Sequence, residues 1–151
     1  MQNAGATCTR RHFFAKVVVG ASLLAGAATA GCAAVATYSA NLSGGRIKLD
    51  HNQLELKMGE GNAILVRASP LPDVLILLRH ENGTFTALNA RCTHLGCQVR
   101  PGGEFLTCPC HQSTFDRWGK VVRGPAQKPL SSYPVEVREE QIEIVIDHAS
   151  S

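Results

Sequence analysis

The sequence predicts an all-β protein, a small antiparallel sandwich or barrel preceded by one N-terminal hydrophobic helix. From residue 46 onward, apolar and polar residues alternate with a period of two, as in "RIKLD", "QLELK" and "VEVREEQIEIVID". The run "DVLILLRHENGTFTAL" joins two strand-like halves across Asn82-Gly83, which is a strong hairpin signal, and "NAILVRA" has strand length. No segment after residue 46 shows a helical stripe with caps.

Length and composition limit the classes of protein to consider. A chain of 151 residues has room for one ordinary domain. The net charge of +3 is mild, and the basic residues are scattered instead of forming a stripe. Neither disorder nor a nucleic-acid-binding surface is therefore indicated.

Residues 1–36 are expected to be a signal or a membrane anchor. Arg10, Arg11 and Lys16 precede residues 17–36, which carry no charge and include eleven Ala or Gly residues. A helix of that length would reach the ~30 Å of a bilayer core, although a segment poor in Leu and Ile inserts weakly. "TRRHFFAK" resembles a twin-arginine export signal, which implies export of a folded, cofactor-loaded protein. We expect a bacterial protein on the outer side of the cytoplasmic membrane or in the periplasm.

Three fates of this leader stay open. Ala28-Thr29-Ala30 offers a cleavage site, Cys32 is a poor candidate for lipidation, and the segment can remain uncut as an anchor. Residues 37–45, "TYSANLSGG", are small and polar, and predict a flexible tether. The folded domain is then expected to cover residues 46–147.

Four of the six cysteines and two of the six histidines lie in residues 92–116, "CTHLGCQVRPGGEFLTCPCHQSTFD". A disulfide framework leaves both histidines unexplained, and a Cys–His nucleophile leaves three cysteines without a role. Zinc takes both residue types, but its structural sites usually pair Cys with Cys and His with His. This chain instead has two mixed pairs, Cys92-x-His94 and Cys108-x-x-His111. A [2Fe–2S] cluster with two Cys on one iron and two His on the other uses such a set.

Two motifs carry a family resemblance. "CTHLGC" and "CPCHQS" resemble the two boxes of Rieske iron–sulfur proteins, although Gln112 stands where Gly is usual. "FDRWGKVVRGPAQKPL" resembles the continuation and the Pro-rich covering loop of that family, so that the likeness spans residues 88–135. It implies a Rieske-type β fold with two cluster-binding loops and one [2Fe–2S] cluster. The implied residues are Cys92 and Cys108 on the inner iron, His94 and His111 on the outer iron, and a disulfide between Cys97 and Cys110.

The same resemblance assigns roles to residues near the cluster. His111, at the exposed tip, is the expected contact for a quinol, with Leu95 among its apolar surroundings. Ser113 matches a hydroxyl that bonds a cluster sulfide. Phe115 stands where high-potential members carry a tyrosine, which predicts a lower potential suited to menaquinol.

The resemblance implies the iron–sulfur subunit of a cytochrome bc-type, quinol–cytochrome c reductase complex. Its partners would be cytochrome b, a c-type cytochrome and a quinol at a shared site. The alternative is an exported electron-transfer subunit or free carrier of another oxidoreductase, such as a molybdenum enzyme. The short gap of thirteen residues between His94 and Cys108 keeps that alternative open.

The remaining residues receive simpler interpretations. Four histidines in polar surroundings are expected to be ordinary surface residues: His12, His51, His80 and His148. Trp118 is expected to pack a loop. Lys120, Arg123 and Lys128 form a solvated face or steer an acidic redox partner.

Overall fold

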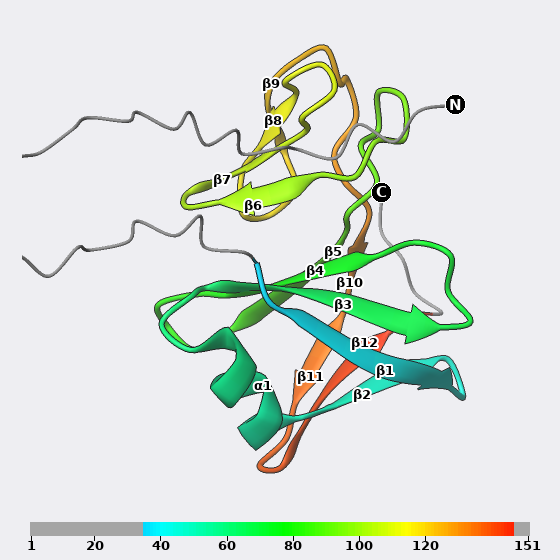
Figure 1. Ribbon diagram of the computed structural model, residues 1–151, viewed down its shortest axis with the longest axis vertical. Coiled ribbons are helices and arrows are strands. Elements are labelled where there is room, and N and C mark those ends of the chain that lie inside the picture. The colour runs from blue at the N-terminus through cyan, green and yellow to red at the C-terminus, as the bar shows by residue number, and fades with distance from the viewer. Residues whose placement is uncertain (1–34, 147–151) are drawn as a thin grey trace, which may run out of the picture. The chain divides into compact units, whose positions relative to one another are not determined.

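The computed structural model describes residues 35–146, which form a larger sheet, a smaller sheet and one short helix (Figure 1). The larger sheet contains β1 (Thr37–Ser43), β2 (Arg46–Asp50), β3 (Ala63–Ser69), β4 (Leu75–Arg79), β5 (Phe85–Asn89), β10 (Ser132–Tyr133), β11 (Val135–Val137) and β12 (Gln141–Val145). The smaller sheet contains β6 (Arg100–Gly102), β7 (Phe105–Thr107), β8 (Thr114–Phe115) and β9 (Val121–Arg123). The helix is α1 (His51–Met58).

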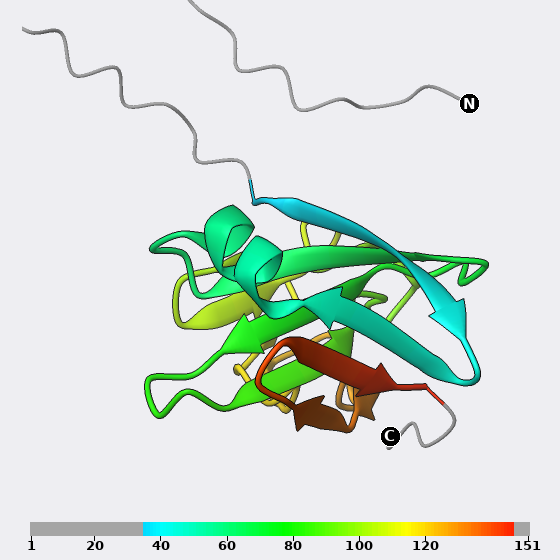
Figure 2. The same ribbon diagram turned by 90° about the horizontal axis from the view of Figure 1, so that it is seen from below.

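The larger sheet is a nearly closed barrel. Its strand order is β10-β5-β4-β3-β1-β2-β12-β11, and the two strands at its ends are separated along the chain by Pro134 alone. Every pair is antiparallel except β1 with β3, and Figure 2 shows β12 between β2 and β11. The prediction of a small, mainly antiparallel β domain is confirmed, including the hairpin of β4 and β5.

Strand β4 explains why the sequence contains the continuous apolar run "LILL". Leu75 and Leu77 point into the barrel core, whereas Ile76 and Leu78 belong to a second core that includes Leu106 of the smaller sheet. A strand buried on both faces is apolar at every position. The smaller sheet therefore packs on the apolar outer face of β4, formed by Ile76 and Leu78.

Polar contacts also join the two sheets. The Arg117 guanidinium donates to the backbone oxygens of Gly103 at 3.1 Å, Asn62 at 3.2 Å and Arg79 at 2.8 Å. The rings of His80 and Trp118 stack with centroids 5.3 Å apart. These contacts hold the smaller sheet on the end of the β4–β5 hairpin and the loop before β3.

The expectation that no helix follows residue 46 is wrong, because "QLELK" lies in α1 and not in a strand. Asp50 caps the helix by accepting a 2.8 Å hydrogen bond from the Gln53 backbone N–H. Leu54 and Met58 are buried one turn apart, whereas Leu56 is 85% exposed. The alternation of Leu54 and Leu56 therefore does not reflect a sheet.

The predicted tether over residues 37–45 is also wrong. Residues 37–43 form β1, which pairs in parallel with β3 over five residues and with β2 in the opposite direction. The folded domain thus begins before residue 46. The predicted leader lies outside the described residues up to residue 34, and no helix within residues 35–146 is long and apolar enough to cross a membrane.

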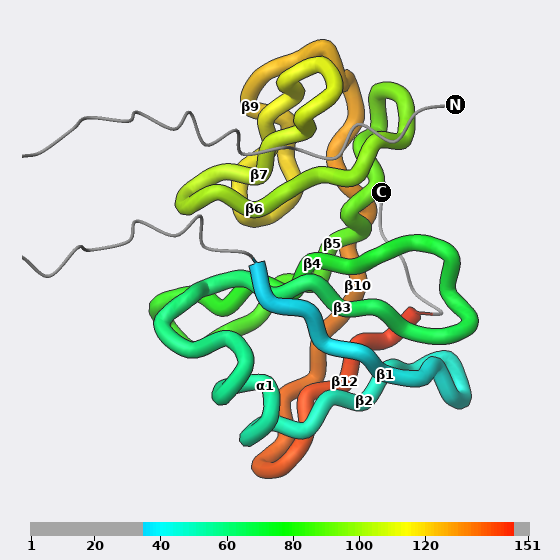
Figure 3. The backbone as a smooth tube through the Cα atoms, in the orientation of Figure 1, coloured from blue at the N-terminus to red at the C-terminus, as the bar shows by residue number. Residues whose placement is uncertain are grey.

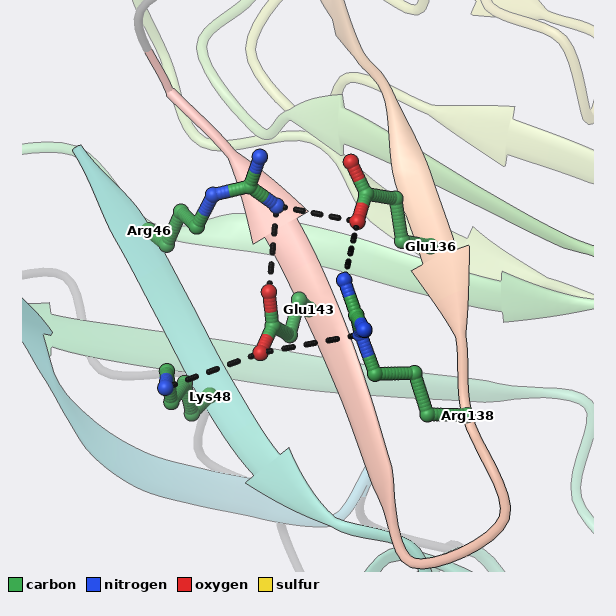
Figure 4. A network of polar contacts seen from close by, with 5 residues as sticks. All are labelled: Arg46, Lys48, Glu136, Arg138 and Glu143. Atoms are coloured by element: carbon green, nitrogen blue, oxygen red, sulfur yellow. Dashed lines mark hydrogen bonds and ion pairs between the residues drawn. The ribbon is translucent and has the colours of Figure 1, made fainter.

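A network of charged side chains lies on the outer surface of β2, β12 and β11 (Figure 4). Glu136 and Glu143 stand opposite each other on paired strands, an arrangement that is unfavourable for like charges. Arg46 contacts both carboxylates at 3.0 Å, and Arg138 contacts Glu136 at 2.9 Å. Hydrogen bonds from Arg46 and then Arg138 lower the pKa of Glu136. These ion pairs connect β2, β12 and β11 on the outside of the barrel, so their charges serve to stabilise the fold.

Candidate metal centre

Two loops next to the smaller sheet carry the clustered cysteines and histidines, and their backbone can be followed in Figure 3. The first loop connects β5 to β6, and the second connects β7 to β8. Each contains a six-residue turn, 92–97 or 108–113, that begins with a cysteine. The cysteine N–H donates to the backbone oxygen five residues later, from Cys92 to Cys97 and from Cys108 to Ser113, both at 2.8 Å. Each cysteine oxygen accepts from the residue four positions later, so the loops share one backbone plan.

The fifth residue of each six-residue turn has left-handed backbone. Gly96 has φ 78° in the first loop, and Gln112 has φ 59° in the second. Gln112 is the only non-glycine residue within residues 35–146 with a positive φ. A residue with a Cβ adopts this region at a cost, which explains why glycine is usual at the position that Gln112 occupies.

The disulfide implied by the family resemblance is confirmed. Cys97 and Cys110 are joined with Sγ atoms 2.04 Å apart, and they link the two loops across a sequence separation of 13 residues. The Sγ atom of Cys108 lies within 4.8 Å of both disulfide sulfurs. Because Cys97 and Cys110 are consumed by their own bond, these three sulfurs are not a ligand set.

The other two cysteines within residues 35–146 are free and buried. Cys92 is 2% exposed and Cys108 is 1% exposed. Burial raises the pKa of the Cys92 thiol, and the neighbouring Cys108 side chain raises it further. The His94 backbone N–H and the Ser113 hydroxyl act in the opposite direction on the same sulfur. The His94 N–H and the Ser113 O–H are thus already directed at the Cys92 sulfur, which would be a thiolate if it bound a metal.

The two histidines of the loops lie side by side. The ring centroids of His94 and His111 are 4.9 Å apart, and the planes are nearly perpendicular at 89°. The Nδ1 atom of His94 is buried without a hydrogen-bond partner, and no other buried side-chain nitrogen or oxygen in the described part of the chain is left so. A buried polar atom without a partner costs about 1–3 kcal/mol of stability. Binding of a metal to this nitrogen would remove that cost.

These observations fit a metal group. Two buried free thiols and two adjacent imidazoles, one with an orphaned Nδ1, form a Cys₂His₂ donor set. Such a set suits either zinc or a [2Fe–2S] cluster that divides sulfur and nitrogen between two irons. The residues that could hold the group are Cys92, His94, Cys108 and His111.

The segment from Gly124 to Leu130 is bonded to both loops. The Ala126 backbone N–H donates to the Ser113 hydroxyl at 3.0 Å, and Ser113 is fully buried. The Thr93 hydroxyl donates to the Lys128 backbone oxygen at 2.6 Å. One bond to each loop keeps this segment, which resembles the Pro-rich covering loop, in fixed register with both.

Two apolar residues named from the sequence lie in opposite environments. Phe115 is fully buried in the same apolar cluster as Cys92 and Cys108. Leu95, next to His94, is 69% exposed. His111 is also exposed, so the first loop presents an apolar side chain to solvent and the second loop presents an imidazole.

Sequence reasoning missed the residues that seat this centre on the barrel. His80 is half-buried, stacks on Trp118 and bonds the Thr86 hydroxyl at 2.7 Å, so its interpretation as an ordinary surface histidine is wrong. Trp118 does contact a loop residue as expected, but it stays 61% exposed. Arg117 binds backbone oxygens, which no side-chain pattern in the sequence could have identified.

Comparison with known proteins adds independent information. The profile of the Rieske [2Fe-2S] domain matches residues 41–134. The chain is 48% identical over 75 residues to the cytochrome b6-f complex iron-sulfur subunit 2 of the Cyanophora paradoxa cyanelle, and 37% identical over 76 residues to the cytochrome b6-f complex iron-sulfur subunit of Chlorobaculum tepidum. These alignments cover 46% and 49% of this chain but 31% and 41% of the relatives, so the chain spans less than half of their length.

A solved structure of a Rieske protein is also similar to this chain. The plasma membrane Rieske protein PetC3 of the cyanobacterium Synechocystis PCC 6803 has 28% sequence identity and a TM-score of 0.52. The match covers 63% of this chain and 93% of that one. The likeness therefore includes nearly the whole of the smaller protein.

Proposed function

Because this chain belongs to the Rieske [2Fe–2S] family, we propose that it carries one electron at a time on a [2Fe–2S] cluster. Four side chains would hold the cluster: Cys92, His94, Cys108 and His111. When bound, a cluster with two histidine ligands supplies reversible one-electron chemistry at about −150 to +300 mV. The orphaned Nδ1 of His94 is the observation that supports this proposal most directly.

The two histidines have different surroundings. His94 is half-buried with its Nδ1 enclosed, whereas His111 is exposed. We assign contact with a reaction partner to His111, with exposed Leu95 offering an apolar surface beside it. The ring nitrogen of His111 that does not bind metal can hold or release a proton. Electron and proton movement can therefore be coupled at one side chain, as oxidation of a quinol requires.

We further propose that the chain is the iron–sulfur subunit of a cytochrome bc-type complex. It would accept an electron from a quinol and pass it to a c-type or f-type cytochrome, with cytochrome b completing the quinol site. The names of the relatives, cytochrome b6-f complex iron-sulfur subunits, support this assignment. We also propose that residues 1–36 direct twin-arginine export and associate the protein with the membrane.

One feature favours a second candidate, a carrier for another oxidoreductase such as a molybdenum enzyme. Along the chain, the two loops are separated by the short β6–β7 hairpin, whose strands have three residues each. Intact mass of the mature protein separates the candidates, because a retained N-terminal segment favours the anchored subunit and a cleaved one favours the free carrier.

The test of the electron-carrier function is purification of the protein with its native partners. We expect stoichiometric iron and sulfide, a rhombic EPR signal after dithionite, and bleaching of the visible spectrum on addition of quinol. His94→Ala should abolish the cluster, whereas the matched variant His51→Ala, outside the loops, should retain it. A colourless protein that contains zinc would refute the proposal.

A further inference from the structure

The described residues have a strongly uneven charge distribution. Residues 91–130, which contain both ligand loops and the smaller sheet, include six Lys or Arg and two Asp or Glu. Residues 35–90 and 131–146, which form the barrel, include six basic and nine acidic residues. The two ends of the molecule therefore carry net charges of opposite sign.

The acidic residues of the loop end do not offset its positive charge near the ligands. Asp116 is half-buried, and its carboxylate accepts 2.9 Å hydrogen bonds from the backbone N–H groups of Trp118 and Lys120. Glu104 lies in the turn of the β6–β7 hairpin, at the opposite end of β7 from Cys108. Neither carboxylate contacts a basic side chain of the ligand loops.

Three basic residues flank the ligand loops from three different segments. Arg100 on β6 pairs with Thr107, which precedes Cys108, and Arg123 on β9 pairs with Thr114, at the end of the second loop. β6 and β9 are the two edges of the smaller sheet. Lys128 is fixed to the first loop through the bond from Thr93. Three segments that adjoin the ligand loops therefore each carry a positive residue.

These three cations are unpaired. Arg100, Arg123 and Lys128 are exposed, and none forms an ion pair with any residue in the range 35–146. In the barrel, by contrast, four of the six cations are paired with carboxylates: Arg46, Lys48, Arg79 and Arg138. Figure 4 shows three of these, Arg46, Lys48 and Arg138. An uncompensated charge of one sign around an exposed site raises the local concentration of an oppositely charged partner.

We propose that Arg100, Arg123 and Lys128 form a docking surface for an acidic redox protein, which approaches the exposed His111. This inference rests on the proposed electron-carrier function and adds the charge of the partner. The cations would orient the acidic partner and accelerate encounter, while the exposed imidazole and Leu95 make the closest approach. Complementary charges affect mainly the association rate and its dependence on salt.

The experiment measures oxidation of the reduced holoprotein by an acidic and a basic c-type cytochrome in stopped flow. Ionic strength is raised from about 0.01 M to about 0.15 M, which shortens the Debye length from ~30 Å to ~8 Å. With the acidic cytochrome, the second-order rate constant should fall about tenfold or more over this range. The basic cytochrome should react slowly and accelerate with salt.

A pair of matched double variants separates the docking surface from total charge. Arg123→Gln with Lys128→Gln should slow oxidation by the acidic cytochrome about three- to tenfold at low salt and flatten its salt dependence. Lys57→Gln with Arg67→Gln removes the same charge from exposed barrel positions and should change the rate less than about twofold. Both pairs must retain iron and the visible spectrum.

Each contrary result has a definite meaning. Equal effects of the two variants, or a rate that rises with salt for the acidic cytochrome, would overturn the docking surface. Binding of the wild type to anionic phospholipid vesicles, lost with Arg123 and Lys128, together with no discrimination between cytochromes, would also overturn it in favour of a membrane contact. A protein without iron would instead refute the electron-carrier function, so the two failures are distinguishable.

Discussion

The guanidinium of Arg117 donates a 2.8 Å hydrogen bond to the backbone oxygen of Arg79, joining the segment after β8 to the end of β4. Two further bonds, to Gly103 and Asn62, fix the hairpin of the smaller sheet and the loop before β3 to the same side chain. One half-buried cation thus connects three backbone segments. This side chain holds the smaller sheet on the barrel, in addition to the apolar contacts with β4.

Replacing Arg117 by Met should therefore lower the free energy of unfolding by about 1.5–3 kcal/mol, the net value of hydrogen bonds from a charged group. The apolar stem is kept, so the loss reports the bonds and not the packing. Urea unfolding measures the change. Arg67→Met, at an exposed position on β3, is the control and should cost less than about 0.5 kcal/mol. Equal losses in both variants would rule out the role given to Arg117.

The disulfide between Cys97 and Cys110 should stabilise the domain as well as align the loops. It closes a loop with a sequence separation of 13 residues, for which chain entropy gives about 3 kcal/mol. The double variant Cys97→Ala with Cys110→Ala should unfold at correspondingly lower urea and lose iron faster. Treatment of the wild type with reductant should reproduce both effects. A double variant as stable as the wild type would contradict this expectation.

Gln112 offers a stabilising substitution. Its backbone is left-handed, so Gln112→Gly should relieve the Cβ conflict and raise the free energy of unfolding by about 0.5–1 kcal/mol. Gln127→Gly is the matched control, because Gln127 has no positive φ and glycine there only adds freedom to the unfolded chain. If both variants are destabilised equally, the strain at Gln112 is not significant.

The candidate ligands could be proposed from the sequence because their chemistry resides in residue identity. Cysteine and histidine at fixed spacing indicate a donor set whatever the surrounding fold. The strands of the β4–β5 hairpin were predictable for a related reason, since Asn82-Gly83 and the apolar run of β4 are strong local signals. The disulfide followed from the resemblance, and the structure confirms it.

The elements that were missed depend on tertiary contacts or on weaker local signals. The small polar residues of β1 acquire strand structure from their pairing with β3, although the alternation of Tyr38, Ala40 and Leu42 is visible in hindsight. For α1, Asp50 with Gln53 three residues later is a helix start signal that outweighs the short alternation. Arg117 has no sequence signal, because all its partners are backbone oxygens.

His80 predicts a pH dependence of stability. Burial, and then the charge of Arg117, lower its pKa below the usual value near 6.5. The folded state therefore binds this proton more weakly than the unfolded state, so the contribution is fully present above about pH 6.5 and falls as the pH drops toward the folded pKa. Stability measured at decreasing pH should decline through this window. His80→Gln should remove that part of the decline, and an unchanged profile would exclude His80 as its source.

Phe115 supplies a prediction about the redox potential. Its ring is fully buried in the apolar cluster that contains Cys92 and Cys108, the two proposed cluster ligands, so we expect a hydroxyl added there to bond to one of their sulfurs and not to water. A hydrogen bond to a charged group contributes about 1.5–3 kcal/mol. At 59 mV per ~1.4 kcal/mol for one electron, Phe115→Tyr should raise the midpoint by about 65–130 mV. Protein-film voltammetry measures this shift directly.

The matched control for this substitution is Phe85→Tyr, because Phe85 packs against the barrel core instead of the ligand cysteines. The control should leave the midpoint unchanged, since its hydroxyl would be added at a different apolar cluster from the one that contains both cysteines. If Phe115→Tyr also leaves the midpoint unchanged while both proteins keep their iron, the ring does not set the potential. A low-potential donor such as menaquinol would then have to be inferred from quinol kinetics alone.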